Sequence, residues 1–96
     1  MKNSALLIID VQNDFCQKGA LEVNEANSII PPINQLIDLF NKKNLFIIAT
    51  KDWHPENHKS FAVNSGKNIG DFGELNGLSQ VFWPVHCVQN SFGSEF

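Results

Sequence analysis

Two short segments of the chain carry the side chains best suited to chemistry. Asp52 and His54 flank a tryptophan, and His86 follows a second tryptophan farther along the sequence. A carboxylate with two imidazoles suits Zn²⁺, and also Fe²⁺ or Mn²⁺. Three protein ligands leave a coordination position for water or substrate, as a catalytic metal centre requires. Asp and His are also common in loops, so the triplet alone predicts a divalent metal site without establishing one.

Asp10 is a second carboxylate placed where chemistry is expected. It follows the continuous apolar run Ala5–Ile9, and the Asp52 segment follows a second apolar run at residues 45–49. In open α/β sheets, ligands bind beyond the carboxyl ends of the strands. If the two runs are neighbouring strands, Asp10 comes within working distance of the metal ligands. The alternative role for Asp10 is that of a helix or turn cap.

The elements that must position these residues form a strand–helix–strand unit. Continuous apolar runs such as Ala5–Ile9 and residues 45–49 are typical of parallel strands that are buried on both faces. Between them, apolar residues recur at three- and four-residue steps over residues 24–43, which predicts an amphipathic helix. Pro31 and Pro32 fit only in its first turn, so the residues before them should form a separate turn. We expect a parallel pair with a right-handed crossover.

The sequence after Thr50 shows no comparable periodicity. Gly66, Gly70, Gly73 and Gly77, separated by Asn, Ser and other residues, predict a long loop over most of this part. Two strands and one helix cannot cover both faces of a parallel sheet. We therefore expect residues 1–96 to form a single, incomplete domain.

The composition limits the class of protein. Of the 96 residues, 43% are hydrophobic and 18% are charged, which is typical of a globular domain. The net charge of −3 and the lack of Arg argue against nucleic-acid binding. No apolar run reaches the roughly 18 residues of a membrane span, and no signal-peptide pattern is present. We expect a cytoplasmic protein with Cys16 and Cys87 as free thiols, the alternative being one disulfide.

Three motifs together give the sequence a family resemblance. Residues 7–21 (LIIDVQNDFCQKGAL) resemble the opening motif of nicotinamidases, which belong to the isochorismatase-like hydrolase superfamily. Residues 50–61 (TKDWHPENHKSF) resemble their metal loop, and residues 83–89 (WPVHCVQ) resemble the segment with their last metal ligand. The motifs stand in family order with compatible spacing. They match the N-terminal half of such an enzyme.

The resemblance implies a fold and a reaction. The expected fold is the N-terminal βαβ portion of a Rossmann-like, three-layer (αβα) parallel-sheet α/β fold. Nicotinamidases (pyrazinamidases) hydrolyse nicotinamide to nicotinate and ammonia in NAD salvage, through a Cys-Asp-Lys triad. Asp10 matches the general base that accepts the thiol proton of the nucleophile. The Cys and Lys of the triad lie beyond residue 96, in the missing C-terminal half, so this chain alone should be inactive.

The resemblance also implies how metal and substrate are held. Asp52, His54 and His86 match metal ligands, and the metal of the family is thought to orient the substrate by holding its pyridine nitrogen. His58 matches a fourth ligand of some members, and Ser60 would hold a water there.

The remaining matches concern the ring pocket and the thiols. Phe15 and Trp83 match aromatic residues that sandwich the pyridine ring, with Leu21 completing the apolar wall. Core packing is the alternative for the two aromatic residues. Cys16 and Cys87 match positions that are not catalytic.

Two other functions stay open. One is that of a different amidohydrolase of the same superfamily, most of which lack the metal set. The other is that of an inactive metal-binding remnant. The sequence does not decide between a monomer and a homo-oligomer.

Overall fold

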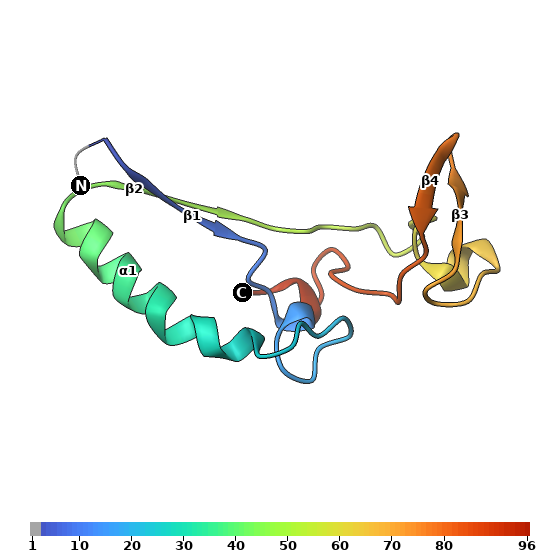
Figure 1. Ribbon diagram of the computed structural model, residues 1–96, viewed down its shortest axis with the longest axis horizontal. Coiled ribbons are helices and arrows are strands. Elements are labelled where there is room, and N and C mark those ends of the chain that lie inside the picture. The colour runs from blue at the N-terminus through green and yellow to red at the C-terminus, as the bar shows by residue number, and fades with distance from the viewer. Residues whose placement is uncertain (1–2) are drawn as a thin grey trace.

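A computed structural model describes residues 3–96 of the chain (Figure 1). Strands β1 (Ala5–Ile9) and β2 (Phe46–Thr50) pair in parallel along their whole length, and helix α1 (Ile30–Lys42) lies between them in the sequence. The predicted strand–helix–strand unit is confirmed, with the second strand beginning one residue later than expected. The fold class is therefore α/β.

Residues 26–42, where the sequence predicts the helix, form two helical pieces. A short 3-10 helix, Ala26–Ile29, precedes α1, which confirms the separate turn expected before the prolines. Pro31 and Pro32 lie in the first turn of α1, where a missing N–H breaks no helical hydrogen bond. After Lys42, Asn44 adopts a left-handed conformation with φ 55°, which ends the helix and turns the chain into β2.

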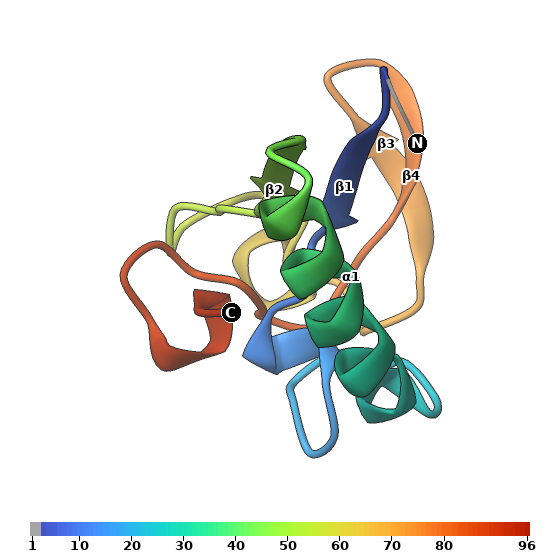
Figure 2. The same ribbon diagram turned by 90° about the vertical axis from the view of Figure 1, so that its left-hand side faces the viewer.

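The β1–β2 pair is covered on one face only. Helix α1 packs against both strands (Figures 1 and 2). On the other face Leu7, Ile9, Phe46 and Ile48 are between 49% and 79% exposed. The register places Leu7 beside Ile48, so these side chains form one continuous apolar surface. We call these four residues the bare sheet face. Residues 3–96 therefore supply two layers of the expected three.

The predicted loop after Thr50 is wrong for one stretch. Strands β3 (Phe72–Leu75) and β4 (Leu78–Val81) form an antiparallel hairpin. Its turn residues Asn76 and Gly77 have φ values of 53° and 81°, the left-handed conformations that a type I′ turn requires. The Asn-Gly pair is a strong hairpin signal that the glycine-rich composition masked.

The molecule is elongated, with the hairpin far from the β1–β2 pair (Figure 1). Its radius of gyration is 16.3 Å, whereas a compact domain of this length would have about 12.5 Å. The largest fully buried side chains, Phe61, Phe82 and Gln12, lie in the loops and not beneath the sheet. Between residues 3 and 96, no helix has the length and apolar character needed to cross a membrane.

Candidate metal centre and substrate cavity

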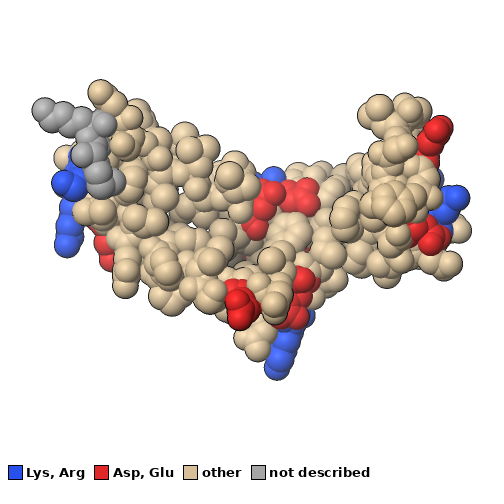
Figure 3. Space-filling model, viewed as in Figure 1, with Lys and Arg blue, Asp and Glu red and all other residues tan. Residues whose placement is uncertain are grey.

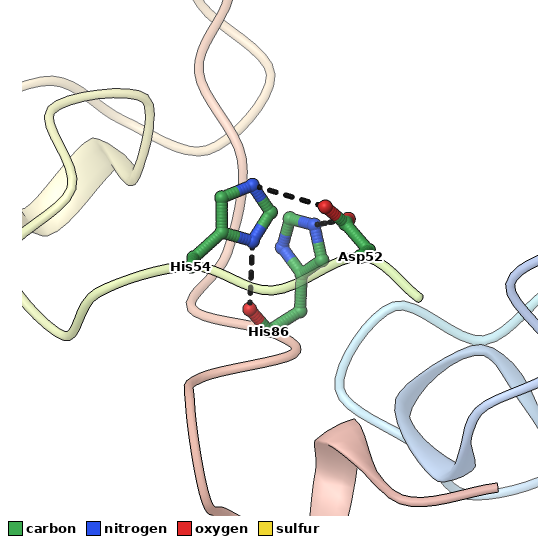
Figure 4. Close-up of side chains that lie close together, drawn as sticks. All are labelled: Asp52, His54 and His86. Atoms are coloured by element: carbon green, nitrogen blue, oxygen red, sulfur yellow. Dashed lines mark hydrogen bonds and ion pairs between the residues drawn. The ribbon is translucent and has the colours of Figure 1, made fainter. Parts of the chain in front are cut away.

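The three predicted metal ligands converge on one point (Figure 4). Oδ1 of Asp52 lies 3.4 Å from Nε2 of His54, and Oδ2 lies 3.3 Å from Nε2 of His86. One ligand atom can be chosen from each of the three residues so that all three atoms lie within 4.8 Å of one another. Ligands at about 2.1 Å from a tetrahedral metal ion are about 3.4 Å from one another. The two carboxylate–imidazole separations, which run to different oxygens of Asp52, are close to that value.

A backbone bridge brings the two loops together. His54 pairs in parallel with Val88 beyond the end of β2. The N–H of His54 donates to the carbonyl of Cys87 at 2.9 Å, and the N–H of Gln89 donates to the carbonyl of His54 at 2.8 Å. The bridge extends the direction of β2 and places His86 beside His54, although the two are far apart in the sequence.

Hydrogen bonds to carbonyl oxygens set the tautomers of both imidazoles. Nδ1 of His86 lies 2.7 Å from the carbonyl oxygen of Pro84, and Nδ1 of His54 lies 3.3 Å from that of His86. A carbonyl only accepts, so Nδ1 is the donor in each ring and Nε2 carries the lone pair. In neutral rings both lone pairs then face the carboxylate of Asp52, an arrangement that a bound metal ion or a proton on Nε2 stabilises. The donor set therefore fits a divalent metal ion, with outer hydrogen bonds of the kind that orient metal-binding imidazoles.

His58 has a different arrangement. Its Nδ1 accepts the N–H of Ser60 at 3.1 Å and lies 2.6 Å from the hydroxyl oxygen of Ser60. The N–H donor requires the lone pair on Nδ1, so the proton is on Nε2. The ring centroid lies 5.0 Å from that of His54, but His58 does not belong to the three-ligand group. In this conformation His58 and Ser60 bind each other, and their roles at the metal stay predictions.

A cavity of about 450 Å³ opens in front of the three ligands. Phe15, Leu21 and Trp83, the predicted ring-binding residues, all line it together with His58 and Ser60. The ring of Phe15 lies 5.7 Å from that of His86 between centroids, and Trp83 is 40% exposed, so it is not a core residue here. Gln80 of β4 also lines the cavity. Gln80 was not among the predicted site residues, because the hairpin that carries it was not predicted.

Asp10 lines a neighbouring cavity of about 610 Å³, together with Phe15 and Cys16. Its Oδ1 accepts the hydroxyl of Thr50 at 2.8 Å, and its N–H bonds to the carbonyl of Thr50 at 3.2 Å. The parallel register thus places Asp10 against the end of β2, and its working distance to the metal ligands stays a prediction. It stands outside the three-ligand group, and Phe15 lines both cavities.

Acidic side chains gather near the concave middle of the molecule, between its two ends (Figure 3). They influence Cys87, which is completely buried. Burial first, and then the negative charges of Asp52, Asp14 and Asp10, raise the pKa of the Cys87 thiol from 9.0 to about 12. Such a thiol is neither a ready nucleophile nor a ready metal ligand. Both cysteines are free, as expected.

Comparison with known proteins defines the family. The isochorismatase domain model matches residues 4–95, so the chain belongs to the isochorismatase domain family. A nicotinamidase of Escherichia coli (strain K12) is 50% identical over 95 residues, which are 99% of this chain and 45% of that protein.

Two solved structures match the fold. An Acinetobacter baumanii nicotinamidase pyrazinamidease superposes with a TM-score of 0.87 at 47% identity, covering 100% of this chain and 45% of that one. The pyrazinamidase of Pyrococcus horikoshii in complex with zinc has a TM-score of 0.75 at 44% identity, covering 96% and 43%. The predicted isochorismatase-like fold is confirmed in part-length form, since the chain spans less than half of the relatives that it matches.

Proposed function

We propose that the chain is the metal- and ring-binding part of a nicotinamidase, which hydrolyses nicotinamide to nicotinate and ammonia in NAD salvage. The observation that carries the proposal is that the predicted metal ligands and the predicted ring-binding residues line one cavity. The nicotinamidases among its relatives support the same reaction. Pyrazinamide-like amides would be alternative substrates.

The chain's own residues would bind and orient the amide. Asp52, His54 and His86 would hold the divalent ion, Zn²⁺ in the first instance, with Fe²⁺ or Mn²⁺ compatible with the same ligands. The bound ion would supply a Lewis-acid contact for the pyridine nitrogen. Phe15 and Trp83 would contact the ring, and stacking on an aromatic heterocycle needs no polar partner. Together these contacts would aim the carboxamide away from the metal and towards the nucleophile.

Asp10 would act as the general base. The Thr50 hydroxyl holds one carboxylate oxygen at 2.8 Å and so restrains the side chain at the edge of the neighbouring cavity. A thiol proton delivered there would leave a thiolate able to attack the amide carbon. The resemblance places that thiol, and the Lys of the triad, in a segment outside residues 1–96.

We propose that this second segment covers the bare sheet face. A parallel sheet is normally buried on both sides, and the four side chains of that face are largely in solvent. Burying a fully exposed side chain of this kind contributes about 1.5–3 kcal/mol, and the four would contribute in proportion to their exposed fractions. Replacing Phe46 and Ile48 with Lys should prevent a separately supplied C-terminal half of a related nicotinamidase from binding, measured by size exclusion. If the chain alone forms a dimer, and the same two changes abolish it, the bare sheet face is instead the interface of a homo-oligomer.

The experiment that tests the metal centre is equilibrium dialysis of the chain against Zn²⁺. The parent chain should bind one equivalent, and His86→Ala should lose most of it. Trp53→Ala is the control, because Trp53 lies between two of the ligands in the sequence but does not line their cavity, and it should bind as the parent does. His58→Ala tests the fourth position: weaker binding would add His58 to the ligand set. Full retention by His86→Ala would remove His86 from the ligand set.

The alternative functions predict different results. A different amidohydrolase of the superfamily would show no stoichiometric metal. An inactive remnant would bind metal yet give no shift in nicotinamide resonances when the zinc-loaded chain is added. Binding of both metal and nicotinamide would support the nicotinamidase proposal.

A further inference from the structure

The turn that follows β1 contacts both loops that carry the metal ligands. It contains Gln12 and the 3-10 helix Asn13–Phe15, and it lies beside the C-terminal segment (Figures 1 and 2). Two of its polar side chains bond to the backbone at or next to a metal ligand, and neither side chain lies in the metal group itself.

The side-chain amide of Gln12 bonds to both the N–H and the carbonyl of Asp52. Its Oε1 accepts the N–H of Asp52 at 2.8 Å, and its Nε2 donates to the carbonyl of the same residue at 2.8 Å. The second proton of Nε2 goes to the carbonyl of Ser94, also at 2.8 Å. The side-chain amide thus pairs with Asp52 as a neighbouring strand would. Gln12 is completely buried, so water cannot replace these bonds without a rearrangement.

Asp14 holds the residue that follows His86. Its Oδ2 accepts the N–H of Cys87 at 2.7 Å. Cys87 has φ 49°, a left-handed conformation that a non-glycine residue adopts only when its surroundings enforce it. The carboxylate also packs against Gly93, where any Cβ would collide with it. Glycine at position 93 therefore leaves room for the Asp14 carboxylate, and any larger residue there would displace it.

We propose that Gln12 and Asp14 are positioning residues of the metal centre, one fixing the backbone of Asp52 and the other fixing the turn behind His86. The inference rests on the proposed metal centre and deepens it. A metal ion requires its ligands within about 0.5 Å of the productive geometry. Side chains that orient ligands from outside the coordination shell typically change metal affinity 10- to 100-fold when they are removed.

The test compares variants that remove these bonds with a matched control. Gln12→Met keeps the length of the side chain and removes its three hydrogen bonds. Asp14→Ala removes the acceptor for Cys87, whereas Asp14→Asn keeps an acceptor oxygen. Asn13→Ser is the control, because the Asn13 side chain donates to the carbonyl of Phe92 at 2.9 Å, in the same C-terminal segment but away from any ligand.

Two quantities are measured for each variant of the 96-residue chain: Co²⁺ affinity with its visible absorption spectrum, and thermal unfolding without metal. Gln12→Met and Asp14→Ala should bind Co²⁺ at least tenfold more weakly, with altered absorption bands. Asp14→Asn should recover most of the affinity, and Asn13→Ser should stay within about twofold of the parent, whatever its unfolding midpoint.

Several results would overturn the inference. Parent-like affinity and spectrum in both Gln12→Met and Asp14→Ala would do so. The inference would also fail if Co²⁺ affinity fell in step with the unfolding midpoint in all variants, Asn13→Ser included. That result would show a general effect on stability. If Gln12→Met does not fold, the comparison of Asp14→Ala with Asp14→Asn decides. A parent chain that binds no Co²⁺ would overturn the proposed metal centre, and this inference with it.

Discussion

Nε2 of His86 lies 3.3 Å from Oδ2 of Asp52, although the two residues belong to loops separated by a complete hairpin. The relationship depends on the bridge between His54 and Val88, which aligns the two loops. It also leaves a lone pair of the imidazole facing a carboxylate oxygen. A metal ion between the two atoms, or a proton on Nε2, removes the repulsion. We interpret the group as a metal centre because a second imidazole, that of His54, converges on the same carboxylate.

Trp83 should contribute to ring binding more than to the fold. Trp83→Ala should weaken nicotinamide binding to the zinc-loaded chain by about tenfold, the effect of losing about 1.4 kcal/mol of stacking and burial. Zinc binding should be unchanged. Isothermal titration with each ligand measures both effects.

Trp53→Ala is the matched control for this prediction. Trp53 is 44% exposed, and Nζ of Lys51 lies 5.2 Å from the centre of its ring. Trp53 does not line the cavity of the metal group, so its removal should leave nicotinamide binding unchanged. Equal losses of nicotinamide affinity in both variants would show that Trp83 affects binding only by stabilising the loops, without contacting the ring.

The two thiols should differ in reactivity. At pH 8, iodoacetamide should modify Cys16, which is partly exposed, and leave Cys87 unmodified in the folded chain. Cys87 is buried, and its pKa is raised from 9.0 to about 12, so between these pH values it ionises in the unfolded chain but not in the folded one. Peptide mass spectrometry gives the sites. Rapid modification of Cys87 in the folded chain would show that its surroundings are open.

The 96-residue chain should release no ammonia from nicotinamide. It holds the predicted base Asp10 and the predicted metal ligands, but no thiol that the resemblance assigns as nucleophile. Catalytic groups act as a unit, so the loss of one removes nearly all of the activity. Ammonia should be measured for the zinc-loaded chain and for the double variant Cys16→Ser, Cys87→Ser. Activity that disappears in the double variant would reveal a nucleophile here, and activity in both would indicate metal-activated water.

The hairpin should depend on its turn. Gly77 has φ 81°, and a residue with a Cβ pays roughly 1–2 kcal/mol in the left-handed region. Gly77→Val should therefore speed hydrogen exchange of the amides in β3 and β4. Ser79→Ala, at an exposed position of β4, is the control and should change little. Equal protection in both variants would contradict the turn assignment.

The convergence of the metal ligands could be predicted from the sequence for a physical reason. Parallel strands end at the same edge of a sheet, and Asp52 and His54 are two residues apart in extended chain, so their side chains point the same way. The α/β class followed from the two apolar runs and the periodic segment between them. The hairpin was missed although Asn76-Gly77 was visible, because its strands lack a strong alternating pattern.

Other features had no sequence signal that pattern reasoning could use. Gln12 and Asp14 bond to backbone groups of residues far along the chain, and every residue other than proline offers the same backbone groups. Likewise, the bond between His58 and Ser60 depends on the local turn, and a ligand-like spacing does not reveal which ring nitrogen is already occupied.

The central claim is that His54 and His86 bind a divalent ion through Nε2, and nitrogen-15 NMR of the histidine rings with and without Zn²⁺ tests it most directly. We expect that both rings carry a proton on Nδ1, that one equivalent of Zn²⁺ shifts their Nε2 resonances, and that His58 keeps its proton on Nε2. Zinc-induced shifts that are larger at Nδ1 than at Nε2, or that occur at His58 alone, would contradict binding through Nε2, as would rings of His54 and His86 that do not respond to the metal.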